Sequence, residues 1–239
     1  MLLPRILVSV ILIGAAVLVL SPLPARSHTV EDFNTWVHLS MTGTLFPAEA
    51  GGSRWRYIID SPSRFGDRAR KYSQAVGRAG IGYTLNSQWS AWAGYSYSHT
   101  DTPYTRVPFG EHRAFQQLSW TGRTGRFTLG TRHRLEERFP ETGNDLGLRL
   151  RHQFRVSHPL GSSKVLSWVL WEEIFLNLNE TDYGARRGVD QNRTFAGVGW
   201  KWSETLRSEA GYMHHFNRRP GGANRVNHVF ALSVALSFR

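Results

Sequence analysis

Hydrophobic and polar residues alternate with a period of two along much of the chain. Residues 147–156 read GLRLRHQFRV, so that Leu148 and Leu150 occupy one parity and Arg149 and Arg151 the other. Successive side chains of a β-strand point to opposite faces, whereas a helix would scatter these residues around its axis. The pattern therefore predicts a strand with an apolar row on one face and a cationic row on the other.

The same alternation recurs along the rest of the chain. Residues 226–238 place Phe230, Leu232 and Val234 opposite small residues, and residues 89–98 begin and end their apolar face with aromatic rings. The strand candidates are 35–45, 54–60, 74–86, 89–98, 111–121, 126–138, 147–156, 164–178, 194–202, 206–217 and 226–238. No segment has the pattern of a long amphipathic helix, so the sequence predicts an all-β chain.

The connectors between these segments alternate between two lengths. Short connectors occupy 86–88, 122–125, 159–163 and 203–204, and longer polar connectors occupy 99–110, 139–145, 179–189 and 218–225. This alternation is typical of an up-and-down barrel with tight periplasmic turns and longer outer loops, and a sandwich with Greek-key crossings gives no reason for it. We predict an antiparallel up-and-down transmembrane β-barrel of 10–12 strands in the outer membrane of a Gram-negative bacterium.

The number of strands is open at this point. Single-chain bacterial barrels have even strand numbers, whereas the candidates above number eleven. Either 54–60 and 64–71 are separate crossings around Pro62, which gives twelve strands, or 35–45 does not span, which gives ten. Twelve is the favoured number. If 86–88 is a periplasmic turn, 35–45 runs in the wrong direction unless one more crossing lies between it and residue 74.

The first 27 residues differ from all that follow. Arg5 supplies a positive charge, residues 6–20 form an apolar run, and Ala25-Arg26-Ser27 resembles a cleavage site; these are the parts of a secretory signal peptide. An uncleaved anchor is the alternative, but the apolar run falls short of the roughly 20 residues that span a bilayer. We predict a signal peptide over 1–27, removed on export, and a single barrel domain over 28–239.

The chain is strongly basic, with 29 Lys and Arg against 18 Asp and Glu and a formal net charge of +11. Nearly all of this charge is guanidinium, because only residues 71, 164 and 201 are lysine. A basic, aromatic-rich chain is also compatible with a nucleic-acid groove, but the export signal and the interleaving of arginine with lipid-facing residues exclude nucleic acid as the expected partner. The absence of cysteine suits an oxidising periplasm.

Charged residues opposite the apolar row are expected to point into the lumen of the barrel. This set consists of Glu111, Arg113, Arg132, Arg134, Glu136, Arg138, Arg149, Arg151, Arg155, Glu173, Arg193, Arg207 and Glu209. Unpaired charges are costly in a poorly hydrated interior, so the acids should pair with neighbouring arginines. Two interpretations follow: a structural ladder of ion pairs that fills the barrel, and a narrow path in which surplus guanidinium groups prefer anions.

Two further sets follow from positions at strand ends and in long connectors. Aromatic residues expected in the girdles at the membrane interfaces are Trp89, Tyr95, Tyr97, Trp120, Trp168, Trp200, Trp202 and Tyr212. Arginines expected to reach the phosphates of lipopolysaccharide are Arg106, Arg186, Arg187, Arg218, Arg219 and Arg225. The expected partners are outer-membrane lipids, lipopolysaccharide and, during biogenesis, the outer-membrane barrel assembly machinery.

A weak candidate for catalysis lies in the first predicted strand. His38 and Ser40 stand two residues apart, as in the H-x-S pairing of barrel-type phospholipases and lipid A deacylases, but Met41 and Thr42 follow where the phospholipase motif continues with Asn-Gly. The histidines at 214–215 are adjacent, so a strand sends them to opposite faces. We expect no catalysis, no cofactor and no metal; an outer-membrane lipid-modifying hydrolase and a soluble periplasmic β protein are the alternatives.

Several strings together carry a family resemblance. They are GYTLNSQWSAWAGYSY (82–97), EHRAFQQ (111–117), RHRLEERF (132–139), EEIFLNLN (172–179) and QNRTFAGVGW (191–200). In order and spacing they resemble the bacterial outer-membrane barrel family known as domain of unknown function 2490, over essentially all of the mature chain. The resemblance implies a fold and a membrane but no reaction. The chain departs from outer-membrane barrels at its end, where Arg239 follows the terminal aromatic Phe238.

Overall fold

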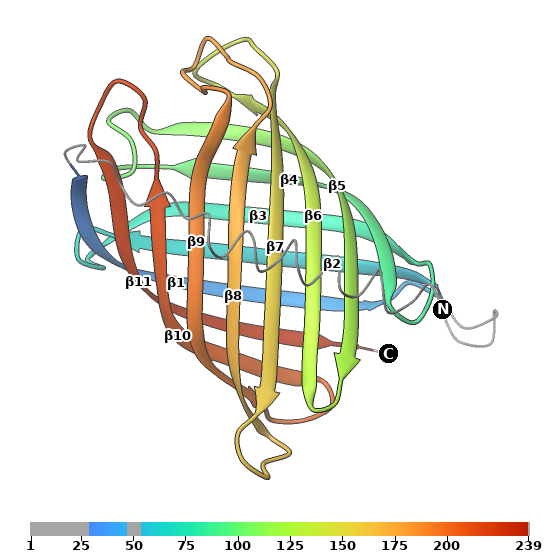
Figure 1. The fold of residues 1–239 in the computed structure, drawn as a ribbon. Coiled ribbons are helices and arrows are strands. Elements are labelled where there is room, and N and C mark those ends of the chain that lie inside the picture. Colours follow the sequence, from blue (N-terminus) through green and yellow to red (C-terminus); the bar gives the residue numbers. More distant parts are fainter. Residues whose placement is uncertain (1–28, 47–53, 239) are drawn as a thin grey trace.

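The computed structural model describes residues 29–46 and 54–238, and the predicted signal peptide lies outside this part of the chain. The described residues form a closed barrel of eleven strands (Figure 1). The strands are β1 (Thr29–Thr44), β2 (Trp55–Gly66), β3 (Lys71–Thr84), β4 (Trp89–Thr100), β5 (Phe109–Thr124), β6 (Phe127–Pro140), β7 (Gly147–Pro159), β8 (Leu166–Asn177), β9 (Gly188–Lys201), β10 (Leu206–Asn217) and β11 (Asn224–Ser237). No helix in residues 29–46 and 54–238 is long and apolar enough to cross a membrane.

The barrel closes through a parallel pairing of its first and last strands. All other neighbouring strands are antiparallel and consecutive in sequence, whereas β1 runs beside β11 in register from Thr29↔Asn224 to Thr42↔Ser237. A closed ring with one parallel seam has an odd number of strands, because the strand direction reverses at each of the remaining pairs. The direction conflict at 35–45 is therefore resolved without an additional crossing.

The favoured count of twelve strands is wrong, and so is the alternative of ten. Residues 54–60 and 64–66 do not form separate crossings, because β2 continues through Pro62. The pairing of β2 with β1 is uninterrupted, with His38 opposite Pro62, while the pairing with β3 omits Ser61 and Pro62. Proline has no backbone N–H to donate, so the chain accommodates it by losing rungs on one side only.

The two ends of the barrel carry different connections. We call the end at which β11 finishes the turn end, and the opposite end, at the upper left of Figure 1, the loop end. Turn-end connections are 45–54, 85–88, 125–126, 160–165 and 202–205, and loop-end connections are 67–70, 101–108, 141–146, 178–187 and 218–223. From β3 onward no turn-end connection is longer than its neighbouring loop-end connections, as predicted. The first two connections break this rule, because 45–54 is long and 67–70 is short.

The two faces of the barrel wall carry opposite kinds of side chain. Large apolar residues point outward and are about half exposed, for example Leu39 (53%), Ile81 (53%) and Val198 (46%). Arginines of the same wall point inward and are buried, with Arg149 only 4% and Arg151 only 7% exposed. A soluble β-sandwich has the reverse arrangement, because its apolar residues meet in a common core.

The ring of Phe115 lies over a pair of opposed glycines in the barrel wall, Gly80 on β3 and Gly94 on β4. A Cβ at Gly94 would lie 2.3 Å from the carbonyl oxygen of Ala79 and 2.6 Å from Cζ of Phe115. Both contacts are far inside van der Waals distance, and one of them is to backbone. The ring therefore needs glycine beneath it.

Gly94→Ala is accordingly expected to lower the free energy of unfolding by about 2–3 kcal/mol, the usual cost of forcing an extra carbon into a packed site. Gly77→Ala is the matched control, because a Cβ at Gly77 would meet nothing within 4 Å. Urea titration of the two variants folded in phospholipid vesicles measures the difference. Equal midpoints would show that the wall at Gly94 is looser than described.

Candidate functional site

Glu111 on β5 is the centre of a first cluster of ion pairs inside the barrel. Nε and Nη2 of Arg113 donate to its two oxygens at 2.9 and 2.8 Å, and those of Arg138 donate at 2.5 and 3.1 Å. Glu111 is almost completely buried. One carboxylate is thus held by two bidentate guanidinium groups, the strongest geometry for this kind of pair.

A second cluster crosses β6, β7 and β8. Glu136 accepts hydrogen bonds from Arg149 at 2.7 Å and from Arg151 at 2.6 Å. Glu173 accepts from the other side of Arg151 at 2.7 Å and from Arg132 at 2.8 Å. Arg151 therefore bridges two carboxylates, and this pairing offsets the cost of taking the charges out of water.

The structure places all thirteen predicted lumen charges on inward parity, and all of them except Arg207 take part in ion pairs among the described residues. Four of these pairs lie outside the contacts above: Arg193 with Glu173 at 3.6 Å, Arg134 with Glu136 at 3.8 Å, Arg149 with Asp190 at 3.5 Å, and Arg155 with Glu209. Arg207 is exposed near the turn end. Most of the network thus occupies the middle and the loop half of the interior, and the Arg155–Glu209 pair extends it towards the turn end.

A third cluster, on β1, β2 and β3, is missed by the sequence reasoning. Asp60 lies 3.1 Å from Nη1 of Arg78 and 3.6 Å from Nε2 of His38. Arg78 has the same parity signal as the other inward arginines and could have been found by it. The inward orientation of Asp60 and Arg64 does not follow from the sequence if the strand is taken to end at Pro62, because the alternation of faces cannot be continued across a break.

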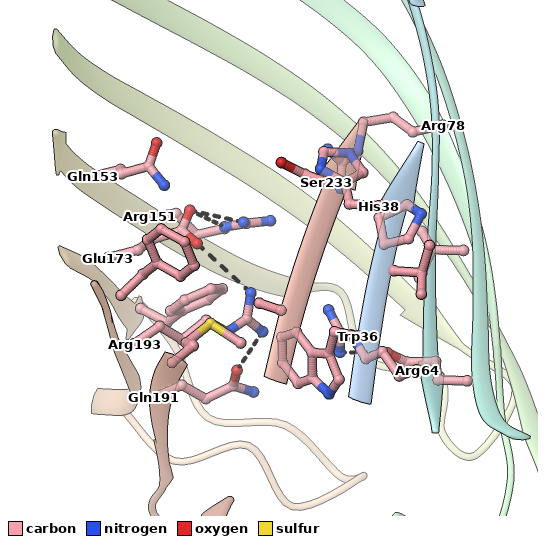
Figure 2. Close-up of a pocket in the computed structure, with 18 of the residues that line it drawn as sticks. Trp36, His38, Arg64, Arg78, Arg151, Gln153, Glu173, Gln191, Arg193 and Ser233 are labelled. Carbon is pink, nitrogen blue, oxygen red and sulfur yellow. Dashed lines mark hydrogen bonds and ion pairs between the residues drawn. The ribbon is translucent and has the colours of Figure 1, made fainter. Parts of the chain in front are cut away.

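These charges surround a cavity of about 400 Å³ inside the barrel (Figure 2). The described residues that line it include nine arginines but only three acids, Glu111, Glu173 and Glu209. Eight of the arginines belong to β2, β3, β5, β6 and β7, and the ninth is Arg193 on β9. The cavity therefore carries a large excess of positive charge, concentrated on one half of the barrel.

The other half of the barrel supplies an apolar wall. Val169, Phe195, Met213 and Val229, on β8 to β11, form a buried cluster in the interior. Trp171 stacks on Phe195 with ring centroids 5.2 Å apart and an interplanar angle of 13°. The cavity is thus cationic on one side and aromatic or aliphatic on the other, a division that the sequence reasoning does not predict.

The connection 101–108 folds into the loop end of the barrel. The Tyr104 hydroxyl accepts a hydrogen bond from Nε1 of Trp36 at 3.2 Å, and Arg225 donates to the carbonyl oxygen of Pro103 at 2.8 Å. Burial raises the pKa of the Tyr104 hydroxyl above its usual value. Tyr104 lines the cavity, so this connection borders it at the loop end.

Two other loop-end connections, 141–146 and 178–187, are tied to each other. The backbone N–H groups of Asn144 and Asp145 donate to the carboxylate of Asp182 at 2.7 and 3.2 Å, and the N–H of Asp182 donates to Asp145 at 2.8 Å. The hydrogen bonds from Asn144 and Asp145 lower the pKa of Asp182. The two connections are therefore held together by hydrogen bonds in both directions at the loop end of the barrel.

The arginines predicted to contact lipopolysaccharide divide into two groups. Exposed residues in loop-end connections are Arg106, Arg186, Arg187, Arg218 and Arg219. Arg225 does not belong with them, because the predicted loop 218–225 ends at residue 223 and β11 begins at Asn224. Arg225 is 8% exposed and donates to Asp32 at 3.0 Å inside the barrel.

The aromatic residues predicted for the girdles fall at different levels of the barrel. Tyr95 and Tyr212 lie at the middle of their strands, Tyr97 lies nearer the loop end, and nearer the turn end are Trp89, Trp168, Trp200 and Trp202. Trp120 also lies near the turn end but is only 8% exposed, because its ring folds over Gly122. Its ring is therefore packed against the wall of the barrel.

The candidate catalytic pair lies on the inner side of β1. His38 is 3.6 Å from Asp60, and the Ser40 hydroxyl donates to the carbonyl oxygen of Val234 at 3.5 Å. No hydrogen bond joins Ser40 to His38 among the described residues. Within the same part of the chain no group of three or more His, Cys, Asp or Glu side chains is placed to hold a metal ion.

Comparisons with known proteins give a family and distant structural likenesses. An uncharacterized protein of Methylorubrum extorquens is 26% identical over 234 residues, covering 95% of this chain and 97% of that protein. Outer-membrane expressed OmpT of Vibrio cholerae and its in-vitro folded trimer form are both similar at a TM-score of 0.40 and 11% identity, over 69% and 72% of this chain. The chain spans 55% and 58% of the length of those two structures.

The family model matches most of the chain, from residue 33 to residue 227. This range begins within β1 and ends within β11, so it covers β2 to β10 completely, together with most of β1 and the first residues of β11. The chain belongs to the family described as protein of unknown function (DUF2490).

Proposed function

We propose that the chain is an exported barrel of the Gram-negative outer membrane whose interior provides a narrow, anion-preferring passage. In this proposal the barrel assembly machinery inserts the chain, lipids surround its outer face, and the exposed arginines of the loop end contact phosphates of lipopolysaccharide. The excess of guanidinium groups around the cavity carries the functional part of the proposal.

The outward-facing residues support a membrane location. Leu39, Ile81 and Val198 belong to a belt of apolar side chains that remain exposed on the isolated barrel. Soluble monomers rarely expose continuous apolar patches larger than a few hundred Å², and a lipid bilayer would cover such a belt. The tryptophans near the turn end, Trp200 and Trp202 among them, agree with one interface of a bilayer.

The balance of charge around the cavity supports the preference for anions. Its three glutamates are already engaged, since Glu111 is held by two arginines and Glu173 lies within ion-pair distance of three. Glu209 pairs with Arg155, and Asp60, Glu136 and Asp190, which do not line the cavity, pair with Arg78 and Arg149. Nine lining arginines thus face six carboxylates, and Arg64 has no carboxylate within 4.0 Å among the described residues. Rings of like charge select counter-ions in narrow pores, so water and anions would balance the excess.

Arg64→Gln tests the passage with the least disturbance of the network. None of the described carboxylates lies within 4.0 Å of Arg64, which donates to Gln74, so its removal leaves no acid unpaired. A unit charge about 5 Å from a passing anion is worth about 0.8 kcal/mol even in bulk water, roughly a fourfold change in anion occupancy. We expect anion-selective conductance in a planar bilayer, with selectivity reduced by Arg64→Gln.

Arg106→Gln is the control for this measurement, because Arg106 is exposed in a loop-end connection. It should leave the reversal potential in a salt gradient unchanged. Silence of the native protein at all voltages would contradict the passage and favour a barrel filled by a structural ladder of ion pairs.

The membrane location has a separate test. A closed barrel in detergent resists unfolding until it is boiled, so boiled and unboiled samples of the membrane fraction should migrate differently in a gel. Identical mobility, together with release into the soluble periplasm, would instead favour the soluble β protein.

The lipid hydrolase alternative depends on Ser40. A serine nucleophile needs a hydrogen-bonded base, whereas the Ser40 hydroxyl bonds to the carbonyl of Val234. Ser40→Ala is therefore expected to leave phospholipid and lipid A profiles the same as in cells with the native chain. A change in either profile that matches the effect of a full deletion would favour the lipid hydrolase over the passage.

A further inference from the structure

We propose that the cavity binds an amphipathic organic anion, an aryl or short alkyl carboxylate, with the carboxylate on the guanidinium group of Arg64 and the apolar part against the wall formed by Trp36, Trp171 and Phe195. This inference rests on the passage proposed above and names the class of solute that the passage would accept.

Trp36 lies between two arginines from strands on either side of the parallel seam. The guanidinium carbon of Arg64 on β2 is 4.1 Å from the centroid of the Trp36 ring, and that of Arg193 on β9 is 5.0 Å away. Figure 2 shows the two side chains on either side of the indole. Two like charges brought to one ring repel each other, so an anion bound to one of them would reduce the repulsion.

Both arginines have hydrogen-bond donors without partners. The Nε atoms of Arg64 and Arg193 are buried, and neither has an acceptor among the described residues. Arg193 is 8% exposed and donates to Gln191 at 3.0 Å, while its other contact, with Glu173, is a looser 3.6 Å. Because the two Nε atoms have almost no accessible surface, a carboxylate in the cavity would bond to the outer nitrogens of a guanidinium group, and Arg64 has no carboxylate within 4.0 Å among the described residues.

The apolar wall determines what the rest of the solute should be. Trp171 and Phe195 stack on each other and line the same cavity as Arg64 and Arg193. An inorganic anion would leave this wall facing water, and a neutral aromatic molecule would leave the charge of Arg64 without a counter-ion. A molecule with one carboxylate and one aromatic or short alkyl group matches both sides.

The size of the cavity agrees with a small organic molecule. Its volume of about 400 Å³ lies in the range of small-molecule sites, roughly 300–1,000 Å³, which are mostly apolar with a few convergent polar groups. Tyr104 lines the cavity from the loop end, so a solute arriving from that end would pass its hydroxyl first.

Three probes separate the two halves of the site: 2-naphthoate, 2-naphthylmethanol and acetate. Each is titrated into the full barrel in non-ionic detergent by calorimetry, with empty micelles as background. We expect 2-naphthoate to bind at least roughly tenfold more tightly than either of the others, because only it engages both walls. Equal affinity for 2-naphthoate and 2-naphthylmethanol would overturn the proposal, because partition into the apolar wall or the micelle would explain both.

Arg64→Gln should weaken binding of 2-naphthoate by roughly tenfold and leave 2-naphthylmethanol unchanged, while Arg106→Gln should alter neither. Heat-dependent gel mobility verifies that each variant is folded, and the comparison of probes on the native barrel stands even where a variant does not fold. Unchanged affinity in folded Arg64→Gln would overturn the assigned carboxylate site. Chloride-selective conductance without binding of 2-naphthoate would refute this inference alone, and binding without conductance would refute the passage alone.

Discussion

Replacing Glu136 with glutamine is expected to lower the free energy of unfolding by about 3–5 kcal/mol, the range observed when one partner of a buried ion pair is removed. Glu136 is 3% exposed and is held by Arg149 and Arg151. Without the charge of Glu136, both guanidinium groups would remain buried but lose this partner. Arg151 would still donate to Glu173. Urea titration of the barrel in phospholipid vesicles, followed by tryptophan fluorescence, measures the loss.

Glu180→Gln is the matched control for this substitution. Glu180 pairs with Arg186 at 3.0 Å, but both side chains are exposed at the loop end. Exposed pairs contribute about 0–1 kcal/mol, so the control should unfold close to the native protein. If the two variants unfold at the same urea concentration, the interior network is well hydrated and the burial described above is contradicted.

Asp32→Ala is expected to lower the free energy of unfolding by about 3 kcal/mol, the second largest effect. The substitution removes a largely buried ion pair and two hydrogen bonds from backbone N–H groups at once. Asp32 on β1 accepts from Arg225 on β11 at 3.0 Å, and from the N–H groups of Asp67 and Arg68 at 3.1 and 3.2 Å. It thus joins the parallel seam to the turn between β2 and β3. Asp67, Arg68 and Ala69 in that turn all have positive φ, a conformation that costs energy in non-glycine residues.

The effect of Asp32→Ala has a local signature as well. Hydrogen exchange should accelerate at the amides of Asp67 and Arg68, and the urea midpoint should fall. Asp67→Asn is the control in the same turn, because asparagine tolerates positive φ and the Asp67–Arg70 pair that it removes is exposed. Unchanged exchange in Asp32→Ala would show that the turn does not depend on this carboxylate.

The sequence predicts the wall of the barrel well, because its signal is local. Residues such as Leu150 and Arg151 differ by one position and point to opposite sides of β7, and a period of two records this directly. The parity of the charged residues also identifies the inward set that the ion pairs contain. The family resemblance is confirmed by the match over residues 33–227.

Features that depend on closure of the sheet are not visible in the sequence. The parallel pairing of β1 with β11 joins residues almost 200 positions apart, and no local pattern reports it. The role of Arg225 depends on the same seam, because its partner Asp32 lies on the first strand. The prediction of a break at Pro62 is wrong, because β2 continues past this residue, which has no N–H, through its pairing with β1 alone.

The composition of the cavity is a second feature that periodicity does not reveal. Parity assigns Phe195 and Met213 to the inner face as readily as it assigns Arg193, but it does not say which inward residues meet. Only the order of strands around the ring places the arginines of β2 to β7 on one half and the apolar cluster on the other. The two-sided cavity therefore becomes visible only in the folded barrel.

Chemical labelling of single cysteines tests the sidedness of the wall most directly, since the chain has no cysteine of its own. Leu170, 44% exposed on the outer face, and Ser233, in the lining of the cavity, are each replaced by cysteine in barrels reconstituted into phospholipid vesicles. We predict that a fluorophore at Leu170→Cys is quenched by brominated lipid, and that Ser233→Cys reacts faster with an anionic than with a cationic methanethiosulfonate reagent. A fluorophore at 170 that lipid does not quench, or faster reaction of the cationic reagent at 233, would contradict a lipid-facing outer wall around a cationic interior.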